Sequence, residues 1–405
     1  MKKNIERDFE ESVKKLSPEY QLLLWSIRVD DKLTDLAKNI LYSKNVIFNF
    51  ESFKRLAFSK GVLSLLYKKM KTLNLDKLNS ELIHVFKEAY MEILARNIKL
   101  TNKLGTLSGI LENNDLDMIA FKGPALGLIA YGDIAYRSSA DLDILVPNNQ
   151  FPEVIEVIRK SGFSPRFPFR EKVVKYLQRS WRDIHLEKDF YHIDIHQQFA
   201  QGPSFLRATS EDLESIVKIK LDTQEVGTLS AEDSLVTMAV HCSKDGFSSL
   251  KHFRDITGII LNNPKLNWER VLSSAKAKKC FRILLISLGL SQKFSGLLLP
   301  SDIEQKIKSR FVKNKIKTFS ERIFSFRFDN ESIYSYISFG GALDTESARL
   351  RFFLWYLFFP SPQLHKKIFK LPSWLFFLIP LLSPFYLSFS HLFRLLRSRM
   401  SHPGK

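Results

Sequence analysis

The sequence is poor in cysteine and has neither a secretory signal nor low-complexity segments. Cys242 and Cys280 are the two cysteines among 405 residues, which excludes a disulfide framework and the paired spacing of a structural zinc site. The N-terminal residues MKKNIERD lack the apolar core that directs secretion. We therefore expect a cytoplasmic protein whose two thiols stay reduced.

Acidic residues are missing from the last part of the chain. After Glu346 there are nine Lys and Arg but no Asp or Glu, and these nine charges are half of the formal net charge of +18. Within this part, Leu371 to Phe393 carries no Asp, Glu, Lys or Arg over 23 residues. That length can span a bilayer, but three prolines divide the run into short segments. We rank a buried or membrane-interfacial hairpin first and a transmembrane helix second.

The basic charges beside this apolar run suggest a partner. An anionic membrane surface fits residues 360–405, which would make the protein peripheral on the inner face of the membrane. Nucleic acid ranks behind it, because positive charge alone is a weak signal. The basic run over residues 306–317 is interleaved with apolar residues, and we interpret it as a helix with one solvated face.

Length and periodicity indicate several parts. With 405 residues, 45% apolar and 26% charged, the chain exceeds one ordinary core and has globular composition. Apolar residues at helical spacing predict a helical preface over residues 1–115 and a helical domain over 206–345. Between them, residues 116–205 form an α/β core, and residues 346–405 form a basic, Phe-rich tail. The expected fold class is α+β, a small mixed sheet flanked by N- and C-terminal helical regions.

The core is predicted from short apolar strands separated by turn residues. Met118–Phe121 is typical of a buried strand that ends at Lys122-Gly123-Pro124, with a short helix behind it. Pro152 and Gly162 bracket a further helix. Tyr191–His196 alternates strictly between apolar and polar residues, which predicts a strand with one polar face.

Two carboxylates stand two residues apart in Arg137-Ser-Ser-Ala-Asp-Leu-Asp-Ile-Leu-Val146. In a strand, residues i and i+2 point to the same face, so Asp141 and Asp143 project together while their neighbours face the core. Two such acids repel one another unless a cation neutralises them. Hard oxygen ligands suit Mg²⁺, which completes its coordination with water and substrate phosphates. The pair therefore favours phosphoryl or nucleotidyl transfer.

Asp194, on the polar face of the later strand, can meet this pair in a sheet. Three convergent carboxylates are what a two-metal site requires, and the third can also help to deprotonate an acceptor hydroxyl. The alternative for Asp194 is a surface acid paired with Arg or Lys. Gly123 would let backbone N–H groups approach phosphate while Lys122 supplies charge, but an ordinary strand-to-helix turn explains these residues equally well. Arg137 can neutralise a triphosphate or form a salt bridge with the acids.

Three further residues have competing interpretations. His196 can orient Asp194 or touch substrate, but a structural histidine explains it at least as well. His241 lies beside an apolar helical stripe, where a core or supporting role is the better interpretation. Asp255 follows Arg254 directly and is interpreted as a local ion pair.

The order and spacing of these motifs resemble the uncharacterised nucleotidyltransferase family of the DNA polymerase β-like nucleotidyltransferase superfamily. The resemblance covers roughly residues 20–260, including Lys60-Gly-Val-Leu-Ser-Leu-Leu-Tyr67 and Arg254-Asp-Ile256. It implies that Asp141, Asp143 and Asp194 are the metal ligands and catalytic acids. Lys122 and Gly123 stand where the wider superfamily has a Gly-Ser turn, whose Ser hydroxyl is missing here. The family often accompanies peptide or surface-polysaccharide biosynthesis in bacteria.

Together these features predict a metal-dependent nucleotidyltransferase. It would use an NTP such as ATP with two Mg²⁺ ions, or Mn²⁺ instead, and transfer NMP to a hydroxyl-bearing small molecule or peptide with release of pyrophosphate. The phosphate-binding residues would be Lys122, Gly123 and Arg137. The alternative is a catalytically degenerate nucleotide-binding or regulatory protein attached to a biosynthetic assembly, which the missing Ser and the basic tail favour.

Overall fold

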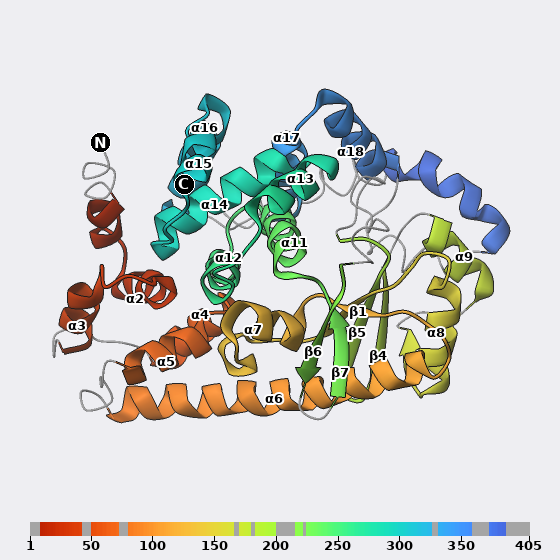
Figure 1. Cartoon of the computed structure of the whole chain (residues 1–405), viewed down its shortest axis with the longest axis horizontal. Coiled ribbons are helices and arrows are strands. Elements are labelled where there is room, and N and C mark those ends of the chain that lie inside the picture. Colours follow the sequence, from red (N-terminus) through yellow and green to blue (C-terminus); the bar gives the residue numbers. More distant parts are fainter. Residues whose placement is uncertain are drawn as a thin grey trace, which may run out of the picture.

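The structure, a computed structural model, describes residues 9–42, 50–72, 80–165, 170–179, 183–199, 215–221, 224–325, 331–358 and 372–385. It has the expected α+β class, with a mixed sheet flanked by helices on both sides in the sequence (Figure 1). The helices before the sheet are α2 (Pro18–Ile27), α3 (Thr34–Tyr42), α4 (Phe50–Ser59), α5 (Leu63–Thr72) and α6 (Ser80–Glu112). Those after it are α11 (Ala231–Lys244), α12 (Leu250–Asn262), α13 (Trp268–Ala277), α14 (Phe281–Ser295), α15 (Ser301–Ile307), α16 (Arg310–Ser325), α17 (Glu331–Ala342) and α18 (Glu346–Phe358).

The sheet has seven strands in the order β3-β4-β5-β2-β1-β7-β6. These are β1 (Ile119–Ala120), β2 (Leu142–Leu145), β3 (Ser164–Pro165), β4 (Ile184–Lys188), β5 (Tyr191–His196), β6 (Val217–Leu221) and β7 (Gln224–Thr228). The helices within this region are α7 (Gly123–Tyr131), α8 (Phe151–Lys160) and α9 (Glu171–Arg179), with a short 3₁₀ helix, η2 (Ile134–Tyr136). Strand β2 lies at the centre, parallel to β5 and antiparallel to β1.

The hairpin of β6 and β7 corrects one expectation, because a helical domain was predicted over residues 206–345. These two strands pair with each other, and β7 pairs with β1, so the sheet continues beyond the predicted end of the core at residue 205. Alternation of Val217, Ile219 and Leu221 with two lysines has the period of a strand. Lysines on an edge strand such as β6 also discourage pairing with another chain. The division of the chain into domains stays a prediction.

Helix α6 connects the two large hydrophobic cores. Its first half contributes Phe86 and Ile93 to a core made with the other N-terminal helices and with α11–α18. Its second half contributes Leu100, Leu104 and Leu107 to the core beneath the sheet, α8 and α9. In Figure 1 this helix runs along the whole lower side of the molecule. A single 33-residue helix thus holds the sheet in place against the helical part.

Local sequence signals fix the ends of the helices around the sheet. Ser230 and Ser249 cap α11 and α12, each accepting a hydrogen bond from the backbone N–H three residues later. Helix α7 ends at Gly132, whose φ of 66° is the left-handed conformation common after helices. Pro152 lies in the first turn of α8, as the sequence predicts.

The C-terminal tail is described over residues 331–358 and 372–385, so most of the predicted membrane-contacting segment, 360–405, lies outside the described residues. In the second range, the 3₁₀ helix η4 (Ser373–Leu378) continues into a helical turn. Ile379 is buried against the core of the sheet, whereas Trp374, Phe377 and Phe385 are 70%, 67% and 76% exposed. None of the described helices is both long and apolar enough to cross a membrane.

Candidate functional site

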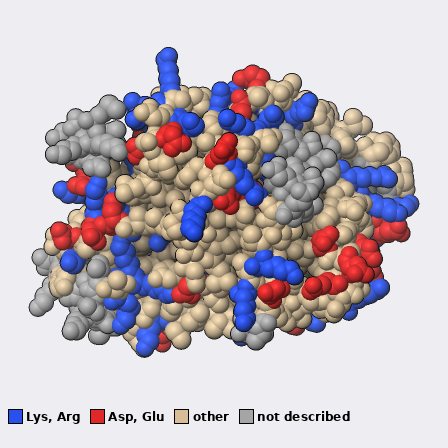
Figure 2. All heavy atoms as spheres, viewed as in Figure 1, with Lys and Arg blue, Asp and Glu red and all other residues tan. Residues whose placement is uncertain are grey.

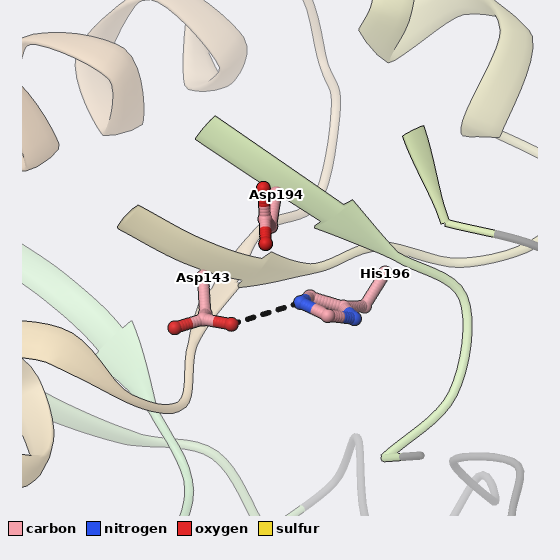
Figure 3. Close-up of side chains that lie close together, drawn as sticks. All are labelled: Asp143, Asp194 and His196. Carbon is pink, nitrogen blue, oxygen red and sulfur yellow. Dashed lines mark hydrogen bonds and ion pairs between the residues drawn. The ribbon is translucent and has the colours of Figure 1, made fainter. Parts of the chain in front are cut away.

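Parallel pairing of β2 with β5 places two carboxylates side by side. In this register Asp143 is opposite Asp194, and Leu142 and Ile144 are opposite Ile193 and Ile195 in the core. Figure 3 shows the side chains of Asp143, Asp194 and His196 converging from the two strands. One ligand atom from each of these three residues lies within 4.8 Å of the others. The two carboxylates at this spacing are hard donors suited to a divalent cation.

Asp141 lies just before β2, half-buried in the wall of the same cleft. Burial raises the pKa of its carboxyl, and the charges of Asp143 and Asp194 raise it further. The charges of Lys122 and Arg137 act in the opposite direction. The three predicted acids therefore face one cleft, where a bound cation would favour their ionised forms.

Asp143 is the most constrained of these acids. Its carboxylate is 7% exposed and accepts from Lys122 Nζ at 2.7 Å and from His196 Nε2 at 2.9 Å. Burial alone would raise the pKa of Asp143, but the charge of Lys122 and the bond from His196 hold it well below its usual range. Both contacts go to Oδ1. Among the described residues, the hydrogen bonds thus leave Oδ2 available to a cation.

His196 links Asp143 to a second buried acid. Its Nδ1 lies 3.1 Å from Asp183 Oδ2, and its other nitrogen binds Asp143. Burial opposes protonation of the ring, but the charge of Asp183 and the two hydrogen bonds outweigh it and raise the pKa of His196 to about 9. At neutral pH the ring is therefore a cation that donates to both acids. Its partners are these two acids rather than Asp194, which the sequence suggested.

The partner of Asp194 comes from the neighbouring strand β4. His185 Nδ1 makes a hydrogen bond with Asp194 Oδ1, and the two residues are opposite each other in the antiparallel pair. This bond raises the pKa of His185. The alternative interpretation paired Asp194 with Arg or Lys. This partner is wrong, because Asp194 forms its ion pair with His185, and both residues line the cleft.

The turn at Lys122-Gly123 brings the lysine to the acids. Gly123 has a φ of 58°, which disfavours most residues with a Cβ atom. A Cβ atom at this position would make only an ordinary contact, 3.4 Å from the carbonyl oxygen of Asp141. The positive φ, rather than lack of space, is therefore the reason for a glycine in this turn. Gly123 begins helix α7, whose N-terminus faces this side of the sheet.

Arg137 forms a buried ion pair with Asp255 of α12. Its Nε lies 3.2 Å from Asp255 Oδ2, and the two side chains are 6% and 0% exposed. Tyr131 Oη donates to the other carboxylate oxygen at 2.7 Å. The interpretation of Asp255 as a local partner of Arg254 is therefore wrong. Arg137 also lines the cleft, where 6% of its side chain is exposed.

A cleft of about 550 Å³ lies between the sheet, the turn that joins α4 to α5, and helices α6, α11 and α12. The three predicted acids, His196, Lys122 and Arg137 line it, whereas Gly123 and Asp255 do not. The cleft includes basic and acidic residues that the sequence patterns did not single out: Arg96, Asp183, His185, Lys244 and Lys251. For Lys244 and Lys251, charged residues between apolar ones on α11 and α12 were the available signal. Figure 2 shows Lys and Arg interspersed with Asp and Glu over one face of the molecule, around uncharged surface.

Comparison with known proteins identifies the family. A sequence model of the family described as uncharacterised nucleotidyltransferase matches residues 48–296, which include every residue that lines the cleft. No curated protein matches the chain. Among solved structures, an antigenic nucleotidyltransferase-like protein from Paracoccidioides brasiliensis is similar, with 15% sequence identity and a TM-score of 0.28. The match covers 62% of this chain and 95% of the Paracoccidioides brasiliensis chain. The chain therefore belongs to the uncharacterised nucleotidyltransferase family, and its activity class is nucleotidyl transfer.

Proposed function

We propose that this protein transfers a nucleoside monophosphate from an NTP to a hydroxyl group on a small molecule or peptide, with release of pyrophosphate. Pairing of β2 with β5, which sets Asp143 beside Asp194 in a cleft rich in basic side chains, carries the proposal. The family match supports the reaction class. Acids and basic groups together suit a substrate that brings both metal ions and phosphates.

Asp141, Asp143 and Asp194 would hold two Mg²⁺ ions, with Mn²⁺ as an alternative. Their carboxylate oxygens are hard donors, and Oδ2 of Asp143 has no hydrogen bond from a described residue. When bound, such ions neutralise charge that develops on the phosphate oxygens during transfer. His196 and Lys122 keep Asp143 ionised and in one orientation, so the protein holds a ligand ready before substrate binds.

The remaining roles follow from position. Asp194 accepts the proton of the acceptor hydroxyl, while His185 orients its carboxylate. The hydroxyl oxygen then forms a bond to the α-phosphorus, and the bond from this phosphorus to the bridging oxygen breaks. Its electron pair leaves with pyrophosphate. Lys122, Gly123 and Arg137 steady the phosphates during the step, through charge and through backbone N–H groups at the start of α7.

Thermal unfolding with nucleotides tests the binding part of this proposal. The melting temperature should rise with an NTP only when Mg²⁺ is present, because ligands that bind the folded state stabilise it. The response should be lost in Asp143→Asn. A nucleotide response that needs no divalent cation, or that survives in this variant, would contradict the metal-holding role of the acids.

A second candidate is a protein that binds nucleotide without transferring it. Two observations favour it. Lys122-Gly123 replaces the Gly-Ser turn that the resemblance implies, and Lys122 and His196 already compensate the negative charge of the Asp143 carboxylate. This alternative predicts Mg²⁺-dependent NTP binding with no pyrophosphate release in the presence of extracts that contain acceptors. Steady pyrophosphate release that depends on Asp143 would exclude it.

We also propose that the tail binds an anionic membrane surface, which would hold the protein peripherally at the inner face of the membrane. Exposed Trp374, Phe377 and Phe385 support this idea, together with the nine Lys and Arg after Glu346. The protein should sediment together with vesicles that contain an anionic lipid, and Trp374→Ser should reduce the fraction that sediments. Equal binding to neutral vesicles would contradict the electrostatic part, and absence of binding to either kind would exclude the proposal. Binding to nucleic acid ranks behind this proposal.

A further inference from the structure

Helices α11 and α12 contribute a basic wall to the cleft. His241 and Lys244 come from α11, and Lys251 and His252 come from the first turn of α12. Two other basic residues of the cleft, Lys122 and Arg137, already pair with acids. His252 Nδ1 lies 3.4 Å from Asp245 Oδ2. His241, Lys244 and Lys251 remain, and they raise the question of which ligand they meet.

His241 presents an unsatisfied nitrogen at this wall. The residue is 7% exposed, yet its Nε2 makes no hydrogen bond to any described residue. Burial and the charges of Lys122 and Lys244 hold the pKa of His241 well below its usual range, so the ring is neutral. Buried polar atoms normally have a partner. A ligand in the cleft can supply the one that is missing here.

Lys244 and Lys251 are half-buried cations in the wall of the cleft. Lys251 Nζ donates to the carbonyl oxygen of Ser138 at 2.7 Å, and Lys244 has no hydrogen bond or ion pair with the residues that the structure describes. Burial, with the charge of Arg137, lowers the pKa of Lys251 to about 8, and burial with the charge of Lys122 lowers that of Lys244. An ammonium group in such surroundings is stabilised by an anionic ligand.

The N-terminal helices help to position Lys251. Gly61, between α4 and α5, has a φ of 67°, and a Cβ atom there would lie 2.7 Å from Cδ of Lys251. The aliphatic part of the lysine therefore passes directly over a residue without a side chain. This contact directs the ammonium group to Ser138 on the cleft wall. It also gives a physical reason for a glycine in the Lys60-Gly61 motif.

We propose that His241, Lys244 and Lys251 bind the β- and γ-phosphates of the NTP and then the pyrophosphate that is released. The assignment rests on the proposed nucleotidyl transfer and adds a second phosphate subsite to it. In the proposed reaction the acids would fix the α-phosphate through the metal ions that they hold. The more highly charged end of the triphosphate then needs its own cations. The two lysines supply charge, and His241 supplies a hydrogen bond.

Direct binding of inorganic pyrophosphate tests this subsite without requiring any turnover. Calorimetric titration in Mg²⁺ should give an affinity that falls about tenfold or more in Lys244→Met and in Lys251→Met, as expected for loss of a charge-assisted contact. Lys265→Met is the matched control, because Lys265 is exposed and lies outside the cleft. Unchanged affinity in both cleft variants would overturn the inference.

Two further measurements keep the test decisive. In the unmodified protein, pyrophosphate should protect Lys244 and Lys251 from acylation as followed by mass spectrometry, so the conclusion does not depend on whether a variant folds. Equal labelling with and without pyrophosphate would overturn the inference. Pyrophosphate should also compete with a non-hydrolysable NTP. Simultaneous binding of both would assign the subsite to a phosphate on the acceptor instead.

The outcome for the subsite is separate from that for the reaction. If the lysine variants bind pyrophosphate normally while label transfer still depends on Asp143, only the subsite assignment fails. If pyrophosphate binding is lost in the variants while no transfer is found with any NTP, the proposed reaction fails and an anion site remains.

Discussion

The ion pair between Arg137 and Asp255 allows a prediction that separates stability from substrate binding. The two side chains are 6% and 0% exposed and lie 3.2 Å apart. Removing one partner of a buried pair leaves an uncompensated charge, which typically costs about 3–5 kcal/mol. In Arg137→Met, Asp255 retains only the bond from Tyr131 among the described residues. We therefore expect the free energy of unfolding to fall by about 3–5 kcal/mol.

Asp255→Asn completes a double-mutant cycle. The amide still accepts from Tyr131 but leaves Arg137 without a counter-charge, so this single variant should lose a similar amount of stability. The double variant carries neither charge and should lose less than either single variant, about 1–3 kcal/mol. The resulting coupling energy should be at least about 3 kcal/mol, well above the additivity error for independent sites. Urea unfolding, monitored by circular dichroism, gives the free energy of unfolding of the unmodified protein and the three variants.

The same variants test whether Arg137 contacts phosphate. If it does, the double variant should recover stability but retain a weaker affinity for the Mg²⁺ complex of an NTP. If the arginine is purely structural, nucleotide affinity should recover together with stability. The reasoning from burial would be refuted if Arg137→Met changed the free energy of unfolding by less than about 1 kcal/mol, the scale of an exposed pair.

Two predictions concern the wall of α11 and α12. Only protonated Lys251 attracts pyrophosphate. Burial, and then the charge of Arg137, lowers the pKa of Lys251 to about 8, while the charges of Asp255, Asp141 and Asp143 act in the opposite direction. The affinity should therefore decrease as pH rises through 8. Lys251→Arg, which stays charged, should flatten that decrease, and an identical profile in calorimetry would contradict the role of Lys251. Gly61→Ala should destabilise the protein by about 1–3 kcal/mol in urea unfolding, because a non-glycine residue at positive φ is strained and its Cβ atom would overlap the side chain of Lys251; an unchanged midpoint would contradict this packing.

The central part of the site could be predicted from sequence because it depends on short-range periodicity. Alternation places Asp194 and His196 on the polar face of β5, and the apolar neighbours of Asp143 fix the face of β2. Parallel pairing of two such strands then brings Asp143 and Asp194 together, as the structure shows. The short helix after Lys122-Gly123 was likewise predicted from turn residues and is α7.

The rest of the cleft depends on packing between distant segments. Arg137 and Asp255 are 118 positions apart, and the contact of Gly61 with Lys251 joins an N-terminal turn to a helix that follows the sheet. No local pattern reveals such pairs. Strands β6 and β7 were missed although β6 alternates between apolar residues and lysines, because each strand has only five residues. Charged residues among the apolar positions of α12, such as Asp255, were the sequence signal that deserved a functional interpretation.

Transfer of label from NTPs labelled at the α-phosphate is the most direct test of the account. Purified protein with Mg²⁺ and an extract containing small molecules and peptides should attach the label to an acceptor and release one pyrophosphate per transfer. Asp143→Asn should abolish both, while Asp189→Asn should leave them unchanged. Asp189 lies on the exposed turn between β4 and β5, outside the cleft, and its φ of 55° is one that Asn tolerates. Label transfer that persists in Asp143→Asn would contradict the role of the carboxylates in nucleotidyl transfer.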